Sequence, residues 1–191
     1  MRKIVSKSEE KSKRKRNQII VGLILVLIMF MSVVGYSFQG SSEEKTDAFV
    51  YGNFKFVKVG DYWKTTFENY ELIFSYSPKE VENIDAKVDS IGKYSNKPLY
   101  LVSNNPLAES EIYRNMQAIV LRMQYACLEG EVCDGSLPTK TCEDNLIIIK
   151  EGEASSITQD ENCTYIEGKP EELVKLSDEF LFKIFGIKDS A

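Results

Sequence analysis

A run of 20 uncharged residues near the amino terminus constrains this chain more than any other feature. The run covers residues 19–38, IIVGLILVLIMFMSVVGYSF, and only two glycines and two serines within it are not strongly apolar. A helix of that length spans about 30 Å, the thickness of the hydrocarbon core of a bilayer. A helix also satisfies its own backbone hydrogen bonds inside lipid. The sequence therefore predicts a transmembrane anchor over residues 19–38, with the lipid bilayer as its partner.

The flanks of this run predict its orientation. Residues 1–16 contain eight Lys or Arg and two Glu, a net charge of +6, so the rest of the chain must carry −11 to give the total of −5. Lys and Arg beside a membrane span remain preferentially on the cytoplasmic side. We therefore expect a basic cytoplasmic tail over residues 1–18, a short polar tether over residues 39–48, and one extracytoplasmic domain over residues 49–191.

Two other kinds of amino-terminal segment fit the same run. A cleavable signal peptide is favoured by the small residues Gly35 and Ser37, but its apolar core is usually about 7–15 residues long, so a retained signal-anchor is the better match. A pilin-like leader, removed on the cytoplasmic side of the run, is a further alternative. All three place residues 49–191 outside the cytoplasm.

The four cysteines, Cys127, Cys133, Cys142 and Cys163, all lie in this outer domain. Their spacing, C-x5-C-x8-C-x20-C, lacks the close pair that structural zinc sites use and the C-x-x-C of redox dithiols. Outside the cytoplasm the default fate of an even number of thiols is pairing. The sequence alone leaves three connectivities open. We favour Cys127 with Cys133 and Cys142 with Cys163, because the first pair closes a loop and the second joins two neighbouring strands.

Alternating and helical patterns predict an α+β domain, with a mixed α/β arrangement as the variant, in the order βββ-α-β-α-β-β-α. The second helix is expected to run from Pro106 toward Cys127, and Gly186 is expected to end the last helix in a left-handed conformation. The full set of expected elements is two strands over 54–67 with a turn at Gly60 and Asp61, a strand over 71–77, a helix over 77–88 capped by Ser77 and Glu80, a strand over 98–104, the Pro106 helix, a strand over 145–150, a hairpin over 156–168 and a helix from Pro170.

Histidine is absent from the whole sequence, which narrows the chemistry. Ser-His-Asp and Cys-His nucleophile systems, histidine-ligated zinc and ordinary haem ligation all require it. Neither a calcium-loop rhythm nor a phosphate-binding glycine loop is present. We therefore expect no catalytic residue, no metal and no cofactor. The net charge of −11 beyond the basic head makes nucleic acid an unfavourable partner.

Two surface features remain. Asn162, Cys163 and Thr164 form an N-x-T sequon, so Asn162 is a candidate glycosylation site. Tyr51, Tyr62 and Tyr70 are candidates for an exposed aromatic surface that binds a protein partner.

These observations predict a single-pass, membrane-anchored, extracytoplasmic binding or scaffold module, stapled by disulfides and part of an envelope complex. The alternatives are an anchored enzyme that uses carboxylates on a glycan or peptide, and a pilin-like filament subunit. A deep cleft with two converging carboxylates favours the enzyme, whereas an aromatic patch on a closed domain favours the binding module.

Overall fold

The computed structural model describes residues 7–39, 47–133 and 135–188, with side chains of the first helix described for residues 14–32. The chain divides into two compact units, Met1–Lys45 and Thr46–Ala191. The tether expected over residues 39–48 falls mostly outside the described residues. The expected cleavage positions Gly35 and Ser37 belong to helix α1, but their side chains are not among those described.

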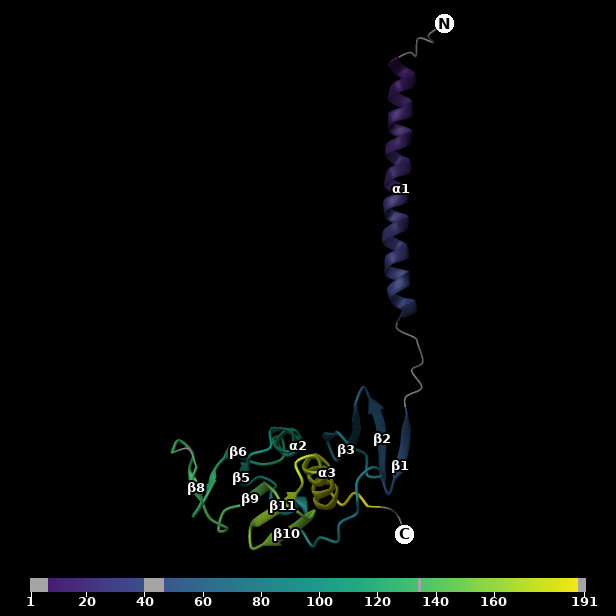
Figure 1. Ribbon diagram of the computed structural model, residues 1–191. Coiled ribbons are helices and arrows are strands. Elements are labelled where there is room, and N and C mark those ends of the chain that lie inside the picture. Colours follow the sequence, from purple (N-terminus) through teal and green to yellow (C-terminus); the bar gives the residue numbers. More distant parts are fainter. Residues whose placement is uncertain (1–6, 40–46, 134, 189–191) are drawn as a thin grey trace. The chain divides into compact units, whose positions relative to one another are not determined.

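The first unit contains one long helix, α1 (Lys7–Gln39), which includes the predicted span (Figure 1). Every large apolar side chain between Ile19 and Met31 is at least 49% exposed. A helix that is apolar on all sides needs an apolar surrounding, as in a membrane. Within the described residues α1 is the one helix that is long and apolar enough to cross a bilayer, over Arg14–Ser32, and both membrane anchors and signal sequences have this property.

The second unit is a mixed α+β domain with several sheets. It begins with a four-stranded antiparallel meander in the order β1-β2-β3-β4. Its strands are β1 (Ala48–Tyr51), β2 (Phe54–Val59), β3 (Tyr62–Phe67) and β4 (Tyr70–Phe74). Val59 pairs with Tyr62, so the turn predicted at Gly60 and Asp61 is confirmed, with Gly60 at a φ of 61°. The strand β1 is one more than the sequence predicted. Phe49 on β1 stacks on Phe56 at 5.4 Å between ring centroids.

The helix predicted over residues 77–88 is wrong. Its cap does form, because the Ser77 backbone N–H donates to Glu80 Oε2 at 2.8 Å, but only a turn follows. Ile84, Ala86 and Val88 then pack at alternate positions against the core, which is the period of an extended chain. Packing of these alternate residues outweighs the local capping signal. Residues 78–90, which we call the strap, lead to the short 3-10 helix η1 (Ile91–Lys93).

A five-stranded sheet forms the centre of the domain, in the order β10-β11-β9-β5-β6. All neighbouring pairs are parallel except β10 with β11. Its strands are β5 (Pro98–Ser103), β6 (Arg122–Tyr125), β9 (Leu146–Glu151), β10 (Ser156–Asp160) and β11 (Cys163–Gly168). The strand over 145–150 and the hairpin over 156–168 therefore agree with the expected positions to within a few residues.

Helices α2 (Pro106–Met116) and α3 (Leu173–Ile184) pack against each other on one face of this sheet (Figure 1). Asn105 caps α2, as predicted, by accepting from the Ala108 N–H at 3.0 Å. The prediction that this helix continues to Cys127 is wrong, since β6 occupies residues 122–125. Pairing of β6 with β5 satisfies the backbone there and returns the chain to the sheet.

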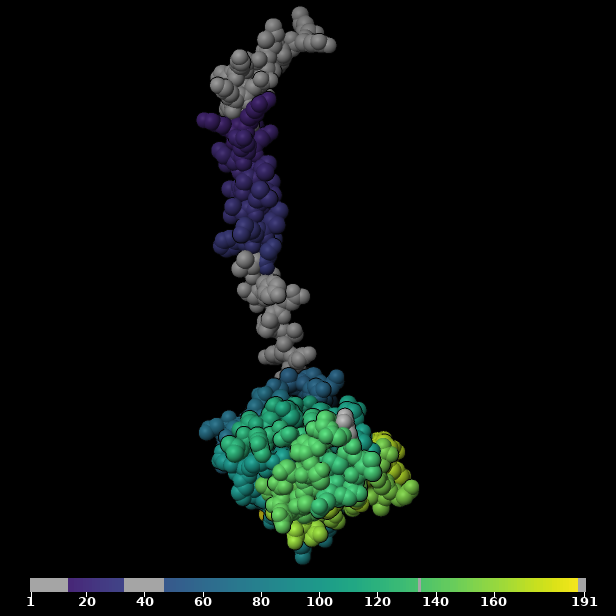
Figure 2. Space-filling view, turned by 90° about the vertical axis from the view of Figure 1, so that its left-hand side faces the viewer, coloured from purple at the N-terminus to yellow at the C-terminus, as the bar shows by residue number. Residues whose placement is uncertain are grey.

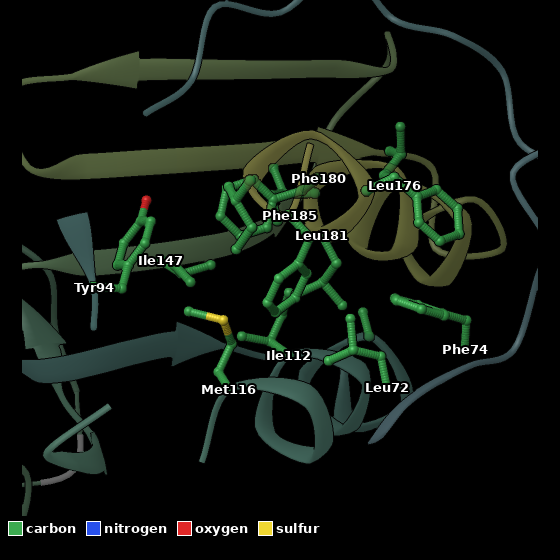
Figure 3. Close-up of a cluster of buried hydrophobic side chains, with 14 of the residues drawn as sticks. Leu72, Phe74, Tyr94, Ile112, Met116, Ile147, Leu176, Phe180, Leu181 and Phe185 are labelled. Carbon is green, nitrogen blue, oxygen red and sulfur yellow. The ribbon is translucent and has the colours of Figure 1, made fainter. Parts of the chain in front are cut away.

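The end of α3 matches the expectation from the sequence. Gly186 has a φ of 68°, and the Ile187 N–H donates to the Phe182 carbonyl at 2.8 Å. This is a left-handed glycine with the bond pattern of a helix C-terminal motif. The side chains of α2 and α3 pack together with those of β4 and with Tyr94 in the main hydrophobic core (Figure 3).

Residues 126–144, which we call the cysteine segment, cover the other face of the five-stranded sheet. This segment contains the short parallel strands β7 (Cys127–Leu128) and β8 (Thr139–Lys140), and its green surface is visible in Figure 2. Tyr100, Leu146 and Ile148 form most of a smaller buried cluster on this face. The structure joins Cys127 to Cys133 and Cys142 to Cys163, with Cα separations of 5.8 and 5.0 Å. This is the connectivity favoured from the sequence.

The turn between β1 and β2 lies against the last described residues of the chain. Gly52 has a φ of 56°, and a Cβ atom added to it would collide with the backbone carbonyl of Lys188. Only glycine combines this backbone conformation with so close an approach.

Candidate functional site

The three tyrosines predicted to form an aromatic surface do not share one face. Tyr51 and Tyr70 pack partly against the core. Tyr62 stands at the opposite end of the meander, where it pairs with Val59, and its exposed fraction is 44%. Alternation along the strands explains the difference, since Tyr70 shares a face with buried Leu72 whereas Tyr62 points away from the core.

The structure instead gathers exposed tyrosines around α2. Tyr113 on α2 is 39% exposed and Tyr125 on β6 is 42% exposed, close to the 44% of Tyr62 on β3. The guanidinium of Arg114 lies 5.0 Å from the centroid of the Tyr62 ring. We call Tyr62, Tyr113, Arg114 and Tyr125 the tyrosine face. Two further apolar side chains are exposed by about 70%, Leu107 in the first turn of α2 and Leu121 just before β6.

Tyr125 is held to α2 by a hydrogen bond. Its hydroxyl donates to Glu109 Oε1 at 2.6 Å. This bond, together with partial burial and the charge of Glu109, raises the pKa of Tyr125 to about 12. The phenol is therefore neutral at physiological pH, and it joins β6 to the exposed side of α2 one turn away from Tyr113.

Arg114 is fixed from behind by the backbone of β4 and by a buried carboxylate. Its Nε donates to the Ile73 carbonyl at 3.2 Å, and a second nitrogen pairs with Glu111 Oε2 at 2.5 Å. Glu111 also accepts from the Ser75 hydroxyl at 2.6 Å. Two oxygen atoms and the Tyr62 ring thus hold the guanidinium. Because it loses little conformational freedom when a partner binds, the orientation of Arg114 at the tyrosine face is preorganised.

Asn115 joins the same helix to β4. Its side-chain oxygen accepts from the Ile73 N–H and its nitrogen donates to the Ile73 carbonyl, both at 2.8 Å. The amide thus replaces the strand that would otherwise pair with this edge of the meander. These buried bonds attach α2 to the backbone of β4, the strand that pairs with β3 and its Tyr62.

Asp178 on α3 is a further buried polar residue near Glu111. It is fully buried, its Oδ2 accepts from the Tyr76 N–H at 2.8 Å, and it lies within hydrogen-bond reach of Glu111. Burial and the nearby charge of Glu111 raise the pKa of Asp178 well above its usual range. Sequence reasoning missed this pair because Glu111 and Asp178 are 67 positions apart and lie on different helices.

The carboxyl groups of Glu111 and Asp178 do not line any of four surface cavities that we compared among the described residues. One cavity, of about 410 Å³, lies between the strap, Tyr51 and the end of α3. Two of its charged groups pair with each other: Lys183 Nζ lies 3.0 Å from Glu179 Oε1, and it also lies 3.3 Å from Asn83 Oδ1. Burial raises the pKa of Glu179 and the Lys183 ammonium opposes this rise. Within the described part of the chain, no group of three Cys, Asp or Glu side chains is arranged to hold a metal ion.

Asn162, the candidate glycosylation site, lies in the turn between β10 and β11. Its side-chain nitrogen donates to the Glu143 carbonyl at 3.2 Å. The threonine of the sequon, Thr164, is fully buried and shares a 2.9 Å hydrogen bond with the Tyr94 hydroxyl. A transferase that must reach the Thr164 hydroxyl finds it covered in the folded domain.

Comparison with protein-family models, with curated proteins and with solved structures yields no match for this chain.

Proposed function

We propose that this protein is a single-pass membrane protein whose extracytoplasmic domain binds a protein partner through the tyrosine face. The observation that carries the proposal is a fixed arginine, Arg114, in contact with the exposed Tyr62. The exposed Tyr113 lies next to this arginine on α2, and the exposed Tyr125 is bonded to the same helix through Glu109. Tyrosine and arginine are enriched at protein interfaces because each supplies a large apolar contact together with hydrogen bonds. A scaffold or assembly role in an envelope complex follows from anchoring such a surface to the membrane.

The anchor part of the proposal rests on α1. Its apolar residues are exposed on every side. The basic residues Arg14, Lys15 and Arg16 stand shortly before its apolar run, on the side where the positive-inside rule expects cytoplasm. The two disulfides favour an oxidising compartment for the domain. A cleaved signal sequence delivers the domain to the same compartment, and the intact mass of the membrane-extracted protein distinguishes the two because it identifies the first residue.

The alternative of a carboxylate enzyme receives less support. Glu111 and Asp178 are carboxyl groups that converge within the described domain, and they are only 2% and 0% exposed. A glycosidase needs both groups against a cleft that admits the substrate. The pilin-like alternative predicts a leader removed before Ile19, which the same mass measurement tests.

Site-specific photo-crosslinking in native membranes tests the binding proposal. A photoreactive amino acid replaces Tyr113 in one variant and Val132, a fully exposed residue of the cysteine segment, in a matched control. We expect a discrete adduct with one protein from position 113 and none from position 132. Equal labelling from both positions, or no adduct from position 113, contradicts the proposal.

Topology has its own test. Protease added to intact cells that express the chain with a carboxyl-terminal epitope should remove the epitope, while the amino-terminal tail stays protected. Protection of the epitope contradicts the extracytoplasmic assignment.

A further inference from the structure

We propose that the buried Asp178 keeps a proton, which it shares with the Glu111 carboxylate in a hydrogen bond, and that this bond acts as a pH-sensitive latch. The latch joins α2 and α3 to the Ser75–Tyr76 segment and holds Arg114 at the tyrosine face. Loss of the shared proton loosens this junction. The link to partner binding rests on the function proposed above, whereas the latch itself is a property of the fold.

The hydrogen bonds of Asp178 indicate that its carboxyl group is protonated in the folded chain. Oδ2 accepts from the Tyr76 N–H, but Oδ1 is buried and has no donor to accept from among the described residues. An ionised Asp178 would leave this charged oxygen without a partner in an apolar interior, which is costly. A proton on Asp178 changes the carboxyl group into a donor toward the neighbouring Glu111 carboxylate, which the Ser75 hydroxyl holds beside Tyr76.

The charges around Glu111 and Asp178 also favour a bound proton. The cation facing it is Arg114 on α2, which bonds to Glu111. From the segment after β4, the donors that the described residues offer to the pair are neutral: the Ser75 hydroxyl and the Tyr76 N–H. On α3, Ser177 is buried and neutral, while Lys175 lies over the Tyr76 ring at 5.0 Å. One guanidinium beside two buried carboxyl groups leaves one negative charge in excess unless a proton is bound.

The consequence for stability follows from proton linkage. The folded chain holds the Asp178 proton at pH values where the unfolded chain, with an ordinary aspartate, has released it. The stabilisation is therefore fully present below the ordinary pKa and is lost as pH rises through the raised pKa of the folded state. The latch is closed at acidic pH and opens toward alkaline pH.

The consequence for the tyrosine face follows from the contacts of Glu111. This carboxylate orients Arg114, and Arg114 lies on Tyr62. When both carboxyl groups are ionised, their repulsion acts on the side chain that fixes the arginine. Partner binding at the tyrosine face should therefore weaken as pH rises.

Carboxyl 13C NMR of the full chain in detergent micelles tests the latch without any substitution. Asp178 should titrate at higher pH than Asp89, whose pKa is lowered by hydrogen bonds from Lys93 and Gln159. In a Glu111→Gln variant the Asp178 transition should move to lower pH, because the neighbouring charge is gone. Titration of Asp178 in the ordinary aspartate range, or a transition unmoved by Glu111→Gln, overturns the latch.

Thermal unfolding gives a second measurement. Asp178→Asn keeps the acceptor for Tyr76 and supplies a permanent donor toward Glu111, so it mimics the closed latch. Between about pH 4 and about pH 8 the Tm of the variant should gain about 3 °C or more relative to that of the unsubstituted protein. The control Asp89→Asn should show little change over this range, since the stabilisation from a lowered pKa is already present above the ordinary aspartate pKa and is lost only at more acidic pH. A constant difference between Asp178→Asn and the unsubstituted protein overturns the latch.

The crosslinking assay separates the latch from the proposed function. Adduct yield from position 113 should fall several-fold as pH rises in the unsubstituted background and remain constant in the Asp178→Asn background. A raised Asp178 transition without any adduct overturns partner binding and leaves the latch standing. Adduct formation with an ordinary Asp178 transition overturns the latch and leaves partner binding standing.

Discussion

The two faces of the five-stranded sheet are stabilised in different ways. The face toward α2 and α3 meets a large cluster of fully buried apolar side chains, including Leu99, Ile147 and Phe180. The opposite face carries a cluster of five buried residues and is covered by a segment with little regular structure. Both disulfides lie on that second face. Covalent closure is found where the apolar contact is small, and it is absent from the described part of the helix-covered face, where packing suffices.

A cavity on the helix-covered face should have the largest effect. Phe180→Ala removes a fully buried ring that meets Tyr94 at 6.3 Å between centroids. We expect a loss of about 4 kcal/mol in the free energy of unfolding, because the packed surroundings cannot collapse into the space. Chemical denaturation measures it. A loss below about 1 kcal/mol would mean that this face is not the main source of stability.

Removal of the longer crosslink should rank second. Cys142→Ala with Cys163→Ala opens a loop between positions 21 residues apart, and we expect a loss of about 3 kcal/mol. Hydrogen exchange should show faster exchange in residues 126–144 while amides of α3 remain protected. Uniform loss of protection in both regions would contradict the division into two faces. The pair Cys127 with Cys133, which closes a shorter loop, serves as the comparison and should cost less.

Release of the helix from the meander should have an intermediate effect. Asn115→Ala leaves the Ile73 N–H without its 2.8 Å acceptor, and we expect a loss of about 2 kcal/mol. Exchange of the Ile73 amide proton by NMR should accelerate more than that of β9 amides. Unchanged protection at Ile73 would show that the amide clamp is dispensable.

The smallest effect is expected at the surface. Tyr125→Phe removes the exposed 2.6 Å bond to Glu109, and the expected change in unfolding free energy is below about 0.5 kcal/mol. The same variant should still lower crosslinking from position 113 if the hydroxyl takes part in the proposed interface. A large loss of stability would mean that Tyr125 belongs to the core.

The sequence predicted those parts of the domain that are governed by local rules. The turn at Gly60, the Asn105 cap and the left-handed Gly186 each depend on neighbours a few residues away. The helix over 77–88 failed because alternate burial of Ile84, Ala86 and Val88 is decided by contact with distant residues. The local residue pattern does not show which distant part of the chain will pack against these side chains.

The same distinction applies to the site. Tyr62 was identified as exposed, but Tyr113 and Tyr125 were not, because nothing in the sequence shows that β6 returns beside α2. The Glu111 and Asp178 pair was invisible for the same reason. Acidic residues at ordinary helix positions look like solvated surface until the fold brings them together.

The contact of Gly52 with the Lys188 carbonyl places the two ends of the domain side by side. Ala48 is only four residues before Gly52, so a short peptide can connect the end of the domain to its beginning. A circularly permuted domain, opened instead at an exposed turn such as Gly60, should keep both sheets and both disulfides intact. The order of elements along the chain would then be free to change, with the arrangement in space preserved.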